Sequence, residues 1–202
     1  MQRQLSQADQ KTHSVVFIDD IREQREVNGL RVLRYAEFLA HESPEKFFNI
    51  AVSDPKHRQR LAEQCLADGL LPFPIRAAES VCYEPNEIGV GSILCAYSVV
   101  TVNATIGRFF HANINSYVAH DCVIGDFVTF APRVNCNGRV IVEDFVTVGT
   151  GAVIRNGEPG GAPIVIGTGA VVGMGAVVTR SVPPGITVVG NPAREISSTV
   201  RN

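Results

Sequence analysis

The chain has 202 residues, of which 45% are hydrophobic and 19% are charged, and its formal net charge is −2. This composition allows one or two domains with a hydrophobic core, and the near-neutral charge excludes the basic footprint of a nucleic-acid-binding protein. The first ten residues are polar, without an apolar signal segment, and the five cysteines form no C-x-x-C pair. Both features favour a reduced, cytoplasmic protein.

The part of the chain before residue 79 predicts a small parallel α/β domain, because short apolar runs alternate with helical segments. Pro55 is favoured in the first turn of a helix that Ser53 or Asp54 can cap. In chain order, the predicted segments are a strand at 14–18, a turn at Asn28-Gly29, a helix over 35–41, a strand at 47–52, a helix over 55–68 and a strand at 70–75.

Residues 88–183 repeat with a period of six. The first position of each row is apolar, the fifth is small or β-branched, and the second is often glycine or asparagine. A helix cannot hold an apolar stripe at this period, and a plain strand alternates at two. Because glycine and asparagine tolerate positive φ, we expect the second positions to form the bends. The pattern predicts a β-solenoid in which three rows make an eighteen-residue coil of a triangular prism.

One uncharged segment, residues 159–179, is long enough to suggest a membrane helix. Its glycines keep the six-residue frame, so no membrane span is predicted. The residues from Gly157 to Pro163 fit the repeat poorly and are expected to form a loop at a corner.

The eighteen-residue coil also predicts neighbours on adjacent coils, and it places His120 beside Gly138 and Asp121 beside Arg139. A neutral imidazole can remove a proton from an attacking amine or hydroxyl, and an adjacent acid can orient it. A bare backbone N–H at Gly138 can stabilise an oxyanion. A solvated surface histidine, an Asp121–Arg139 salt bridge and a simple bend glycine remain the alternatives. Cys122 occupies an inward position, which argues against a nucleophile.

Phe109, Phe127 and Phe145 have the same spacing and should stack in one column at a corner or an outward position. Three exposed rings would be unfavourable in water, so this column indicates a covered surface. We interpret it as part of a subunit interface or a ligand site. A patch shielded by the N-terminal domain or by the loop is the alternative.

The six-residue rows, the segment Asn113–Gly138 (NINSYVAHDCVIGDFVTFAPRVNCNG) and the closing GNPAR resemble the left-handed β-helix, or hexapeptide-repeat, acetyltransferases. The sequence is most similar to the sugar O- and N-acetyltransferases of the NeuD and PglD type. The resemblance implies a mainly β fold, with a left-handed parallel β-helix over residues 79–202. The left hand is implied by the resemblance alone, since parallel crossovers are usually right-handed.

The resemblance also implies roles for individual residues. His120 corresponds to the general base and Asp121 to the acid that supports it, while acetyl-CoA lies between neighbouring subunits of a homotrimer. Gly138 corresponds to the backbone position at the thioester carbonyl, and two further CoA contacts fall on Thr129 and Thr150. Relatives can carry a histidine at the Thr129 position, and His111, one coil away, is a candidate substitute.

Residues 1–78 resemble the Rossmann-like acceptor domain of the same family, but the expected first strand and Gly-rich loop are absent. Either the chain lacks its true start, or the protein holds its acceptor differently. The acid pair Asp19 and Asp20 and the residue Ser53 occupy the positions that correspond to substrate binding.

The predicted function is transfer of an acetyl group from acetyl-CoA to a sugar or a nucleotide-linked amino sugar in surface glycan biosynthesis. The sequence leaves open whether the acceptor is an amine or a hydroxyl. A degenerate, non-catalytic sugar-binding protein is one alternative. A metal hydrolase of the γ-carbonic anhydrase kind is another, but it needs about three histidine ligands and the solenoid offers only His111 and His120, so no metal site is predicted.

Overall fold

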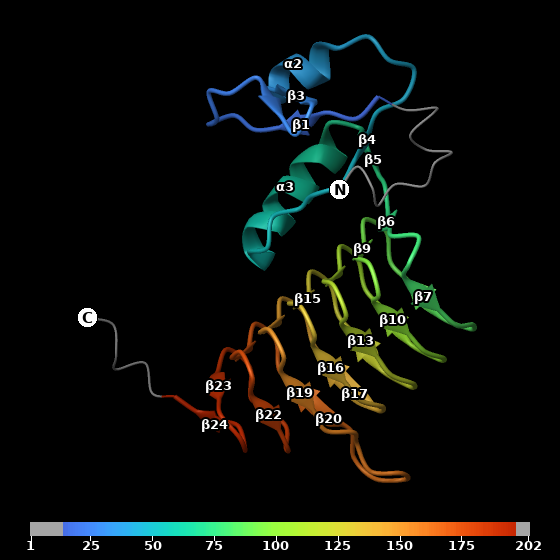
Figure 1. Ribbon diagram of the computed structural model, residues 1–202, viewed down its shortest axis with the longest axis vertical. Coiled ribbons are helices and arrows are strands. Elements are labelled where there is room, and N and C mark those ends of the chain that lie inside the picture. The colour runs from blue at the N-terminus through green and yellow to red at the C-terminus, as the bar shows by residue number, and fades with distance from the viewer. Residues whose placement is uncertain (1–13, 197–202) are drawn as a thin grey trace.

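The computed structural model describes residues 14–196, which form a β-solenoid with a small α/β domain packed along one edge (Figure 1). The coils of the solenoid contribute short strands to three sheets, which form the walls of a triangular prism, and these strands pair in parallel except β24, which is antiparallel to β23. This is the predicted left-handed parallel β-helix. Within the described residues, neither helix is long and apolar enough to span a bilayer.

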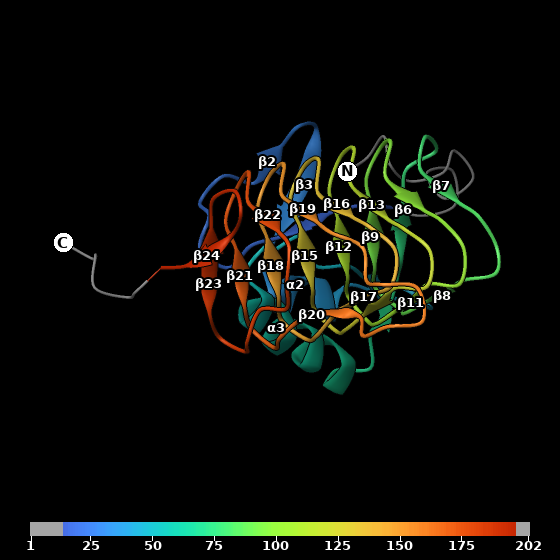
Figure 2. The ribbon, with the colours of Figure 1, turned by 90° about the horizontal axis from the view of Figure 1, so that it is seen from below.

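We call the three sheets the first, second and third faces. The first face contains β7 (Val81–Cys82), β10 (Val99–Val100), β13 (Tyr117–Val118), β16 (Asn135–Cys136), β19 (Val153–Ile154) and β22 (Val177–Val178). The second contains β8 (Glu87–Ile88), β11 (Thr105–Ile106), β14 (Val123–Ile124), β17 (Val140–Val142) and β20 (Ile164–Ile166). The third, whose strands lie side by side in Figure 2, contains β6 (Ile75–Arg76), β9 (Ile93–Leu94), β12 (His111–Ala112), β15 (Thr129–Phe130), β18 (Thr147–Val148), β21 (Val171–Val172), β23 (Thr187–Val189) and β24 (Arg194–Glu195).

The predicted coil length is confirmed by the strand register. Tyr117 pairs with Asn135 on the first face, and His111 pairs with Thr129 on the third, so partners are eighteen positions apart. For the three strand pairs that span the segment between β19 and β20 the offset is twenty-four, as in the pair of Val153 with Val177. The six extra residues form a loop between β19 and β20, where the sequence predicts one. The register also extends back to Ile75, which pairs with Ile93, so the ladder begins before residue 79.

The bends of the coil lie at a different position from the predicted one. The residues with positive φ occupy the fourth position of each row, and most of them are not glycine, as Asp121 (φ 60°) and Phe127 (φ 58°) illustrate. The second-position glycines have no such angle and serve another purpose. A Cβ on Gly107 would lie 2.6 Å from the Gly125 carbonyl carbon on the next coil, so these glycines allow adjacent corners to stack closely.

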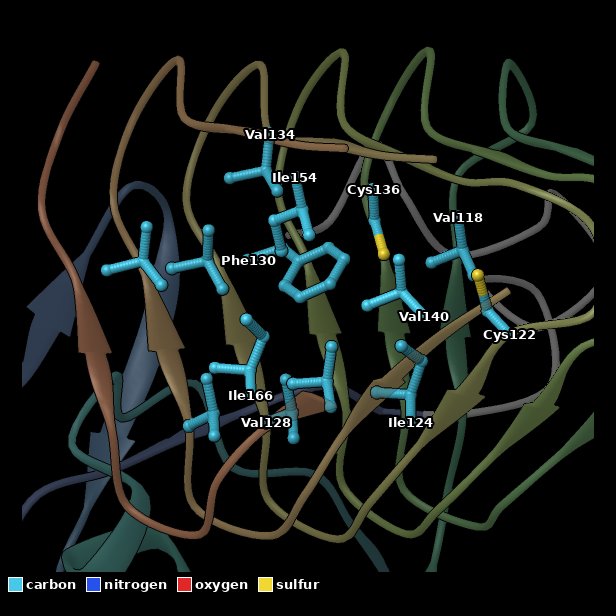
Figure 3. Close-up of a cluster of buried hydrophobic side chains, with 14 of the residues drawn as sticks. Val118, Cys122, Ile124, Val128, Phe130, Val134, Cys136, Val140, Ile154 and Ile166 are labelled. Carbon is cyan, nitrogen blue, oxygen red and sulfur yellow. The ribbon is translucent and has the colours of Figure 1, made fainter. Parts of the chain in front are cut away.

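The first and fifth positions point inward, as predicted, and fill the prism (Figure 3). Apart from Ile88 in an outer coil, the apolar first positions are buried, and small residues at the fifth positions fit the narrow corners. Ile124, Phe130 and Val134 have almost no exposed surface. Burial of this continuous apolar column is the main term that stabilises the solenoid.

The N-terminal part of the chain combines two helices with two small sheets, β1-β3-β2 and β4-β5, where the sequence predicts a single parallel layer. Its elements are β1 (Phe17–Ile18), β2 (Glu26–Val27), β3 (Leu30–Leu33), α2 (Tyr35–Ala40), β4 (Phe47–Phe48), α3 (Pro55–Ala67) and β5 (Leu71–Pro72). β1 pairs with β3 and β4 with β5, both in parallel, while the turn at Asn28-Gly29 joins β2 to β3. Asp54, not Ser53, caps α3, because its carboxylate accepts the His57 backbone N–H at 2.6 Å.

Helix α3 lies between the outer strands and the solenoid (Figure 1), where it covers the phenylalanine column. Phe109 and Phe127 stack with ring centroids 5.3 Å apart, and Phe127 and Phe145 with centroids 5.7 Å apart. Phe109 and Phe127 are almost fully buried and pack with Ala62 and Cys65 of α3. The alternative interpretation is therefore confirmed for Phe109 and Phe127: the N-terminal domain shields both rings, so neither a partner subunit nor a ligand is needed to cover them. Phe145, at the end of the column, is half-buried.

Replacing Phe127 by alanine is expected to lower the free energy of unfolding by about 3–5 kcal/mol, because a buried ring is removed from between two stacked neighbours. Urea denaturation at several protein concentrations measures this loss, and light scattering measures the assembly state. A variant of unchanged stability that dissociates would return the column to a subunit interface.

Candidate functional site

The prism has three corners, which we name after residues that they contain. The His120 corner joins the first face to the second, the phenylalanine corner joins the second to the third, and the Thr150 corner joins the third to the first. In the central coils, the segments that form these corners are 119–122 and 137–139 for His120, 107–110, 125–128 and 143–146 for phenylalanine, and 131–134 and 149–152 for Thr150.

The first group at the His120 corner is a hydrogen-bonded imidazole and carboxylate. His120 Nδ1 lies 2.8 Å from Asp121 Oδ2, and the His120 side chain is half exposed. The backbone of Asp121 has a left-handed φ of 60°, which aspartate tolerates better than most residues. Because a carboxylate faces Nδ1, that nitrogen carries the proton, and Nε2 is left as the free basic atom.

The carboxylate of Asp121 has two further neighbours on the adjacent coils. Asn103 Nδ2 donates to Oδ1 at 3.2 Å, and Arg139 Nε lies 3.9 Å from Oδ2. The hydrogen bond with His120, then the one from Asn103, lowers the pKa of Asp121 below its usual value. The group is therefore an anion at neutral pH. The predicted contact with Arg139 is present, and it coexists with the contact to His120.

Gly138 lies directly against the His120 ring, as the eighteen-residue spacing predicts. A Cβ at this position would lie 2.6 Å from both Cε1 and Nε2 of His120. Glycine is therefore required by close approach, since its own φ is not in the left-handed region. The two groups that the sequence pairs for proton removal and for oxyanion stabilisation are thus in contact.

The backbone N–H of Gly138 has no hydrogen-bond acceptor among the described residues. At the phenylalanine corner, the equivalent amides are occupied by side chains from the next coil. Arg108 N donates to Asp126 Oδ1 at 2.7 Å, and Asp126 N donates to Asp144 Oδ1 at 2.8 Å. A corner amide of this type therefore binds a negatively charged oxygen. At Gly138 no side chain fills the acceptor position opposite the amide, so a ligand oxygen can occupy it.

Buried groups orient the peptide that carries this amide. The Cys122 thiol donates to the Asn137 carbonyl oxygen with a sulfur–oxygen distance of 3.1 Å, and Cys122 has no exposed surface. Because C=O and N–H point in opposite directions in a trans peptide, the Gly138 N–H is directed away from the core. Asn137 is further held by Tyr117, whose hydroxyl donates to its side chain. Burial confirms the inward position of Cys122 and removes it as a nucleophile.

The inserted loop, residues 155–163, lies at the same corner. Gly157 N donates to the Gly138 carbonyl oxygen at 3.0 Å, and Arg155 pairs with Glu158 at 3.0 Å. The loop thus lies one coil below the contact between His120 and Gly138. It extends the wall of the site on that side.

Two residues that the resemblance assigns to the CoA site, or to its neighbourhood, lie beneath the N-terminal domain. The Thr129 side chain is buried, and its hydroxyl already has two polypeptide partners, Arg58 and the Ser53 carbonyl. His111 is buried beside it, with Nδ1 3.3 Å from Arg58 Nη1. The CoA contact of Thr129 and the idea that His111 substitutes for a cofactor ligand both stay predictions; within one chain, both side chains are buried at the boundary with the N-terminal domain.

The remaining predicted residues are spread over other parts of the chain. Thr150 is exposed at its own corner, one prism wall away from His120. In the N-terminal domain, Asp19 Oδ1 accepts the backbone N–H groups of Ile21 and Arg22, and Asp20 Oδ1 accepts that of Tyr35. The structure therefore brings together His120, Asp121 and Gly138, and it does not bring the other predicted residues to them within one chain.

The described residues contain no cluster of three side chains suited to a metal ion. His111 and His120, the two histidines on which the metal alternative depends, lie on opposite sides of the second face. They cannot share a ligand sphere within one chain.

Sequence reasoning missed Asn103 and Arg58. Asn103 precedes Asp121 by eighteen residues, so the coil length alone could have identified it. Arg58 gives no such signal, because it lies on α3, outside the repeat.

No family model matches the chain, but both the sequence comparison and the structure comparison find sugar acetyltransferases. The sequence is 49% identical over 196 residues to the GDP-perosamine N-acetyltransferase of Escherichia coli O157:H7, with 97% of this chain and 88% of that protein aligned. Among solved structures, WeeI from Acinetobacter baumannii AYE superposes with a TM-score of 0.89 at 46% identity, over 94% of this chain and 91% of that one. The acetyltransferase domain of PglB from Neisseria gonorrhoeae FA1090, in complex with acetyl coenzyme A, superposes with a TM-score of 0.83 at 31% identity, over 94% and 90% of the two chains.

Proposed function

Since this chain belongs to the hexapeptide-repeat family of sugar acetyltransferases and uses acetyl-CoA as its co-substrate, we propose that it acetylates the amino group of a GDP-linked amino sugar. The name of the E. coli relative supports GDP-perosamine as the first acceptor to test. The observation that carries the proposal is the contact of the His120 ring with Gly138, whose amide has no acceptor in the part of the chain that the structure describes.

In the proposed reaction, the acceptor amine attacks the carbonyl carbon of the acetyl thioester. His120 Nε2 removes a proton from the amine, while Asp121 holds Nδ1–H and stabilises the positive charge on the ring. The carbonyl oxygen becomes an oxyanion and accepts a hydrogen bond from the Gly138 N–H. The carbon–sulfur bond then breaks, and coenzyme A leaves with the proton from His120. No acyl-enzyme is formed.

We also infer that the working site lies between two copies of the chain in a homotrimer. The segment that contains Ser53 packs against Thr129 near the phenylalanine corner, whereas His120 lies at the far end of the second face. The second face, with β14 as its strand in this coil, separates His120 from Asp126 at that corner. A neighbouring copy, which presents its own N-terminal domain to this His120, would complete the site. Thr150 would then contact CoA from a different corner than His120.

The test is an assay of CoA release by the purified protein with acetyl-CoA and GDP-perosamine. We expect turnover and a product that has gained one acetyl group, and we expect the hydroxy analogue, in which a hydroxyl replaces the amine, to be inert. Light scattering is expected to give the mass of three chains. Binding of acetyl-CoA without turnover on GDP-linked or other amino sugars would favour the non-catalytic alternative, and turnover on the hydroxy analogue alone would make the enzyme an O-acetyltransferase.

A further inference from the structure

Arg58 projects from α3 into the boundary between the N-terminal domain and the solenoid. Its side chain has no exposed surface, which is rare for arginine. On the solenoid side, Nη2 donates to the Phe127 carbonyl at 2.6 Å and to Thr129 Oγ1 at 3.0 Å. On the domain side, Nη1 donates to the Val52 carbonyl at 2.9 Å and to the Ser53 carbonyl at 3.2 Å. One guanidinium group thus joins two parts of the molecule.

No carboxylate contacts this buried cation among the described residues. Asp54 acts on it only through its charge, and the Asp54 carboxylate caps α3 by accepting the His57 backbone N–H. Burial lowers the pKa of Arg58 to about 10, so the group stays charged at neutral pH. Burial and the charge on Arg58 lower the pKa of His111 to about 3, so that ring is neutral and can accept from Arg58 through Nδ1. A charge held only by carbonyls, a hydroxyl and an imidazole is costly to bury, which makes a merely stabilising role a poor explanation.

The segment that Arg58 holds is the one that follows β4. The Ser53 carbonyl accepts from Arg58 and also from Thr129 Oγ1, at 3.2 Å, so the solenoid and α3 fix the same peptide. Ser53 itself is exposed. In parallel α/β sheets, ligands bind beyond the carboxyl ends of the strands, and β4 pairs in parallel with β5 in a two-stranded sheet.

We propose that Arg58 and Thr129 are positioning residues for the acceptor: they clamp the Val52–Asp54 segment onto the solenoid and so fix the place at which the sugar nucleotide binds. This inference rests on the proposed function. It assigns Thr129 to the acceptor through Ser53, and it opposes the cofactor role that the family resemblance implies for Thr129.

The test compares Thr129→Val and Arg58→Lys with the wild-type enzyme by steady-state kinetics, with each substrate varied in turn. Thr129→Val removes the hydroxyl that donates to the Ser53 carbonyl. Arg58→Lys keeps the positive charge but loses the two Nη groups that donate to the domain and to the solenoid at the same time. Loss of one such hydrogen bond is expected to raise the KM for GDP-perosamine about threefold to tenfold. The kcat and the KM for acetyl-CoA should stay at wild-type values, whereas a purely structural defect would lower the active fraction and leave both KM values unchanged.

Thr147→Val is the matched control, since Thr147 pairs with Thr129 one coil further along the same face. It should behave as wild type. An acceptor KM that does not change in Thr129→Val overturns the inference, and an increased KM for acetyl-CoA assigns Thr129 to the cofactor instead. If Arg58→Lys fails to fold, Thr129→Val still decides the matter. If the wild-type protein shows no turnover, the proposed function is overturned. This failure is distinguished from a failure of the positioning role, because it is seen in the wild-type protein alone, without any variant.

Discussion

His120→Ala is expected to lower kcat by about 10²-fold or more while the protein stays folded and binds acetyl-CoA. The ring is half exposed, so its loss leaves no cavity in the core. Its Nε2 is the free basic atom at the corner, because Asp121 occupies Nδ1. Without this base, the attacking amine keeps its proton as the new bond forms. The measurement is steady-state CoA release, with calorimetric binding of acetyl-CoA as the check on the folded site.

His41→Ala is a suitable control, since His41 is an exposed histidine at the end of α2, in the other domain. It should retain wild-type kcat. If His120→Ala also turns over at a near-normal rate, the base assignment is wrong and another group must remove the proton.

Gly138→Ala is expected to lower kcat by roughly 10²-fold or more through geometry alone. The added Cβ would lie 2.6 Å from His120 Cε1 and Nε2 and 3.0 Å from Nδ1, so the ring has to move away from the oxyanion position. The new methyl group would also cover the free amide. Because the displaced ring can swing into solvent, we expect little change in the melting temperature. Circular dichroism and CoA release, measured on the same preparation, separate the two effects.

Gly161→Ala provides the comparison for this substitution. Gly161 is in the loop of the same corner, and a Cβ there approaches only the Glu158 residue, at 3.0 Å or more. It should have a small effect on kcat. Wild-type activity in Gly138→Ala would show that neither the placement of the ring nor access to the amide limits the reaction.

The repeat could be predicted from the sequence because its information is local and periodic. A coil of eighteen residues follows from the spacing of the apolar positions, and it places Asp121 beside Arg139 and His120 beside Gly138 without further assumptions. The prediction failed where two explanations share one pattern. Glycine at the second position fits a positive φ and a close approach equally well, and only the backbone distinguishes them.

The phenylalanine column shows the limit of the same reasoning. The spacing predicts that Phe109, Phe127 and Phe145 stack and that something must cover them. It does not identify the cover, because α3 is far away in the chain and its docking depends on the summed shape of both surfaces. Arg58 was missed for the same reason, since its partners Thr129 and Phe127 follow it by about seventy residues.

By itself, the sequence determined the coil length, the inward positions and the pair of groups at the His120 corner, because each depends on a fixed interval along one strand path. The tertiary structure alone decided which corner the N-terminal domain covers, which residue holds the Ser53 peptide, and that the Ser53 segment and His120 lie at different corners. These features depend on contacts between segments with no common period. Their free energy comes from burial and hydrogen bonding at a surface that exists only after both domains have folded.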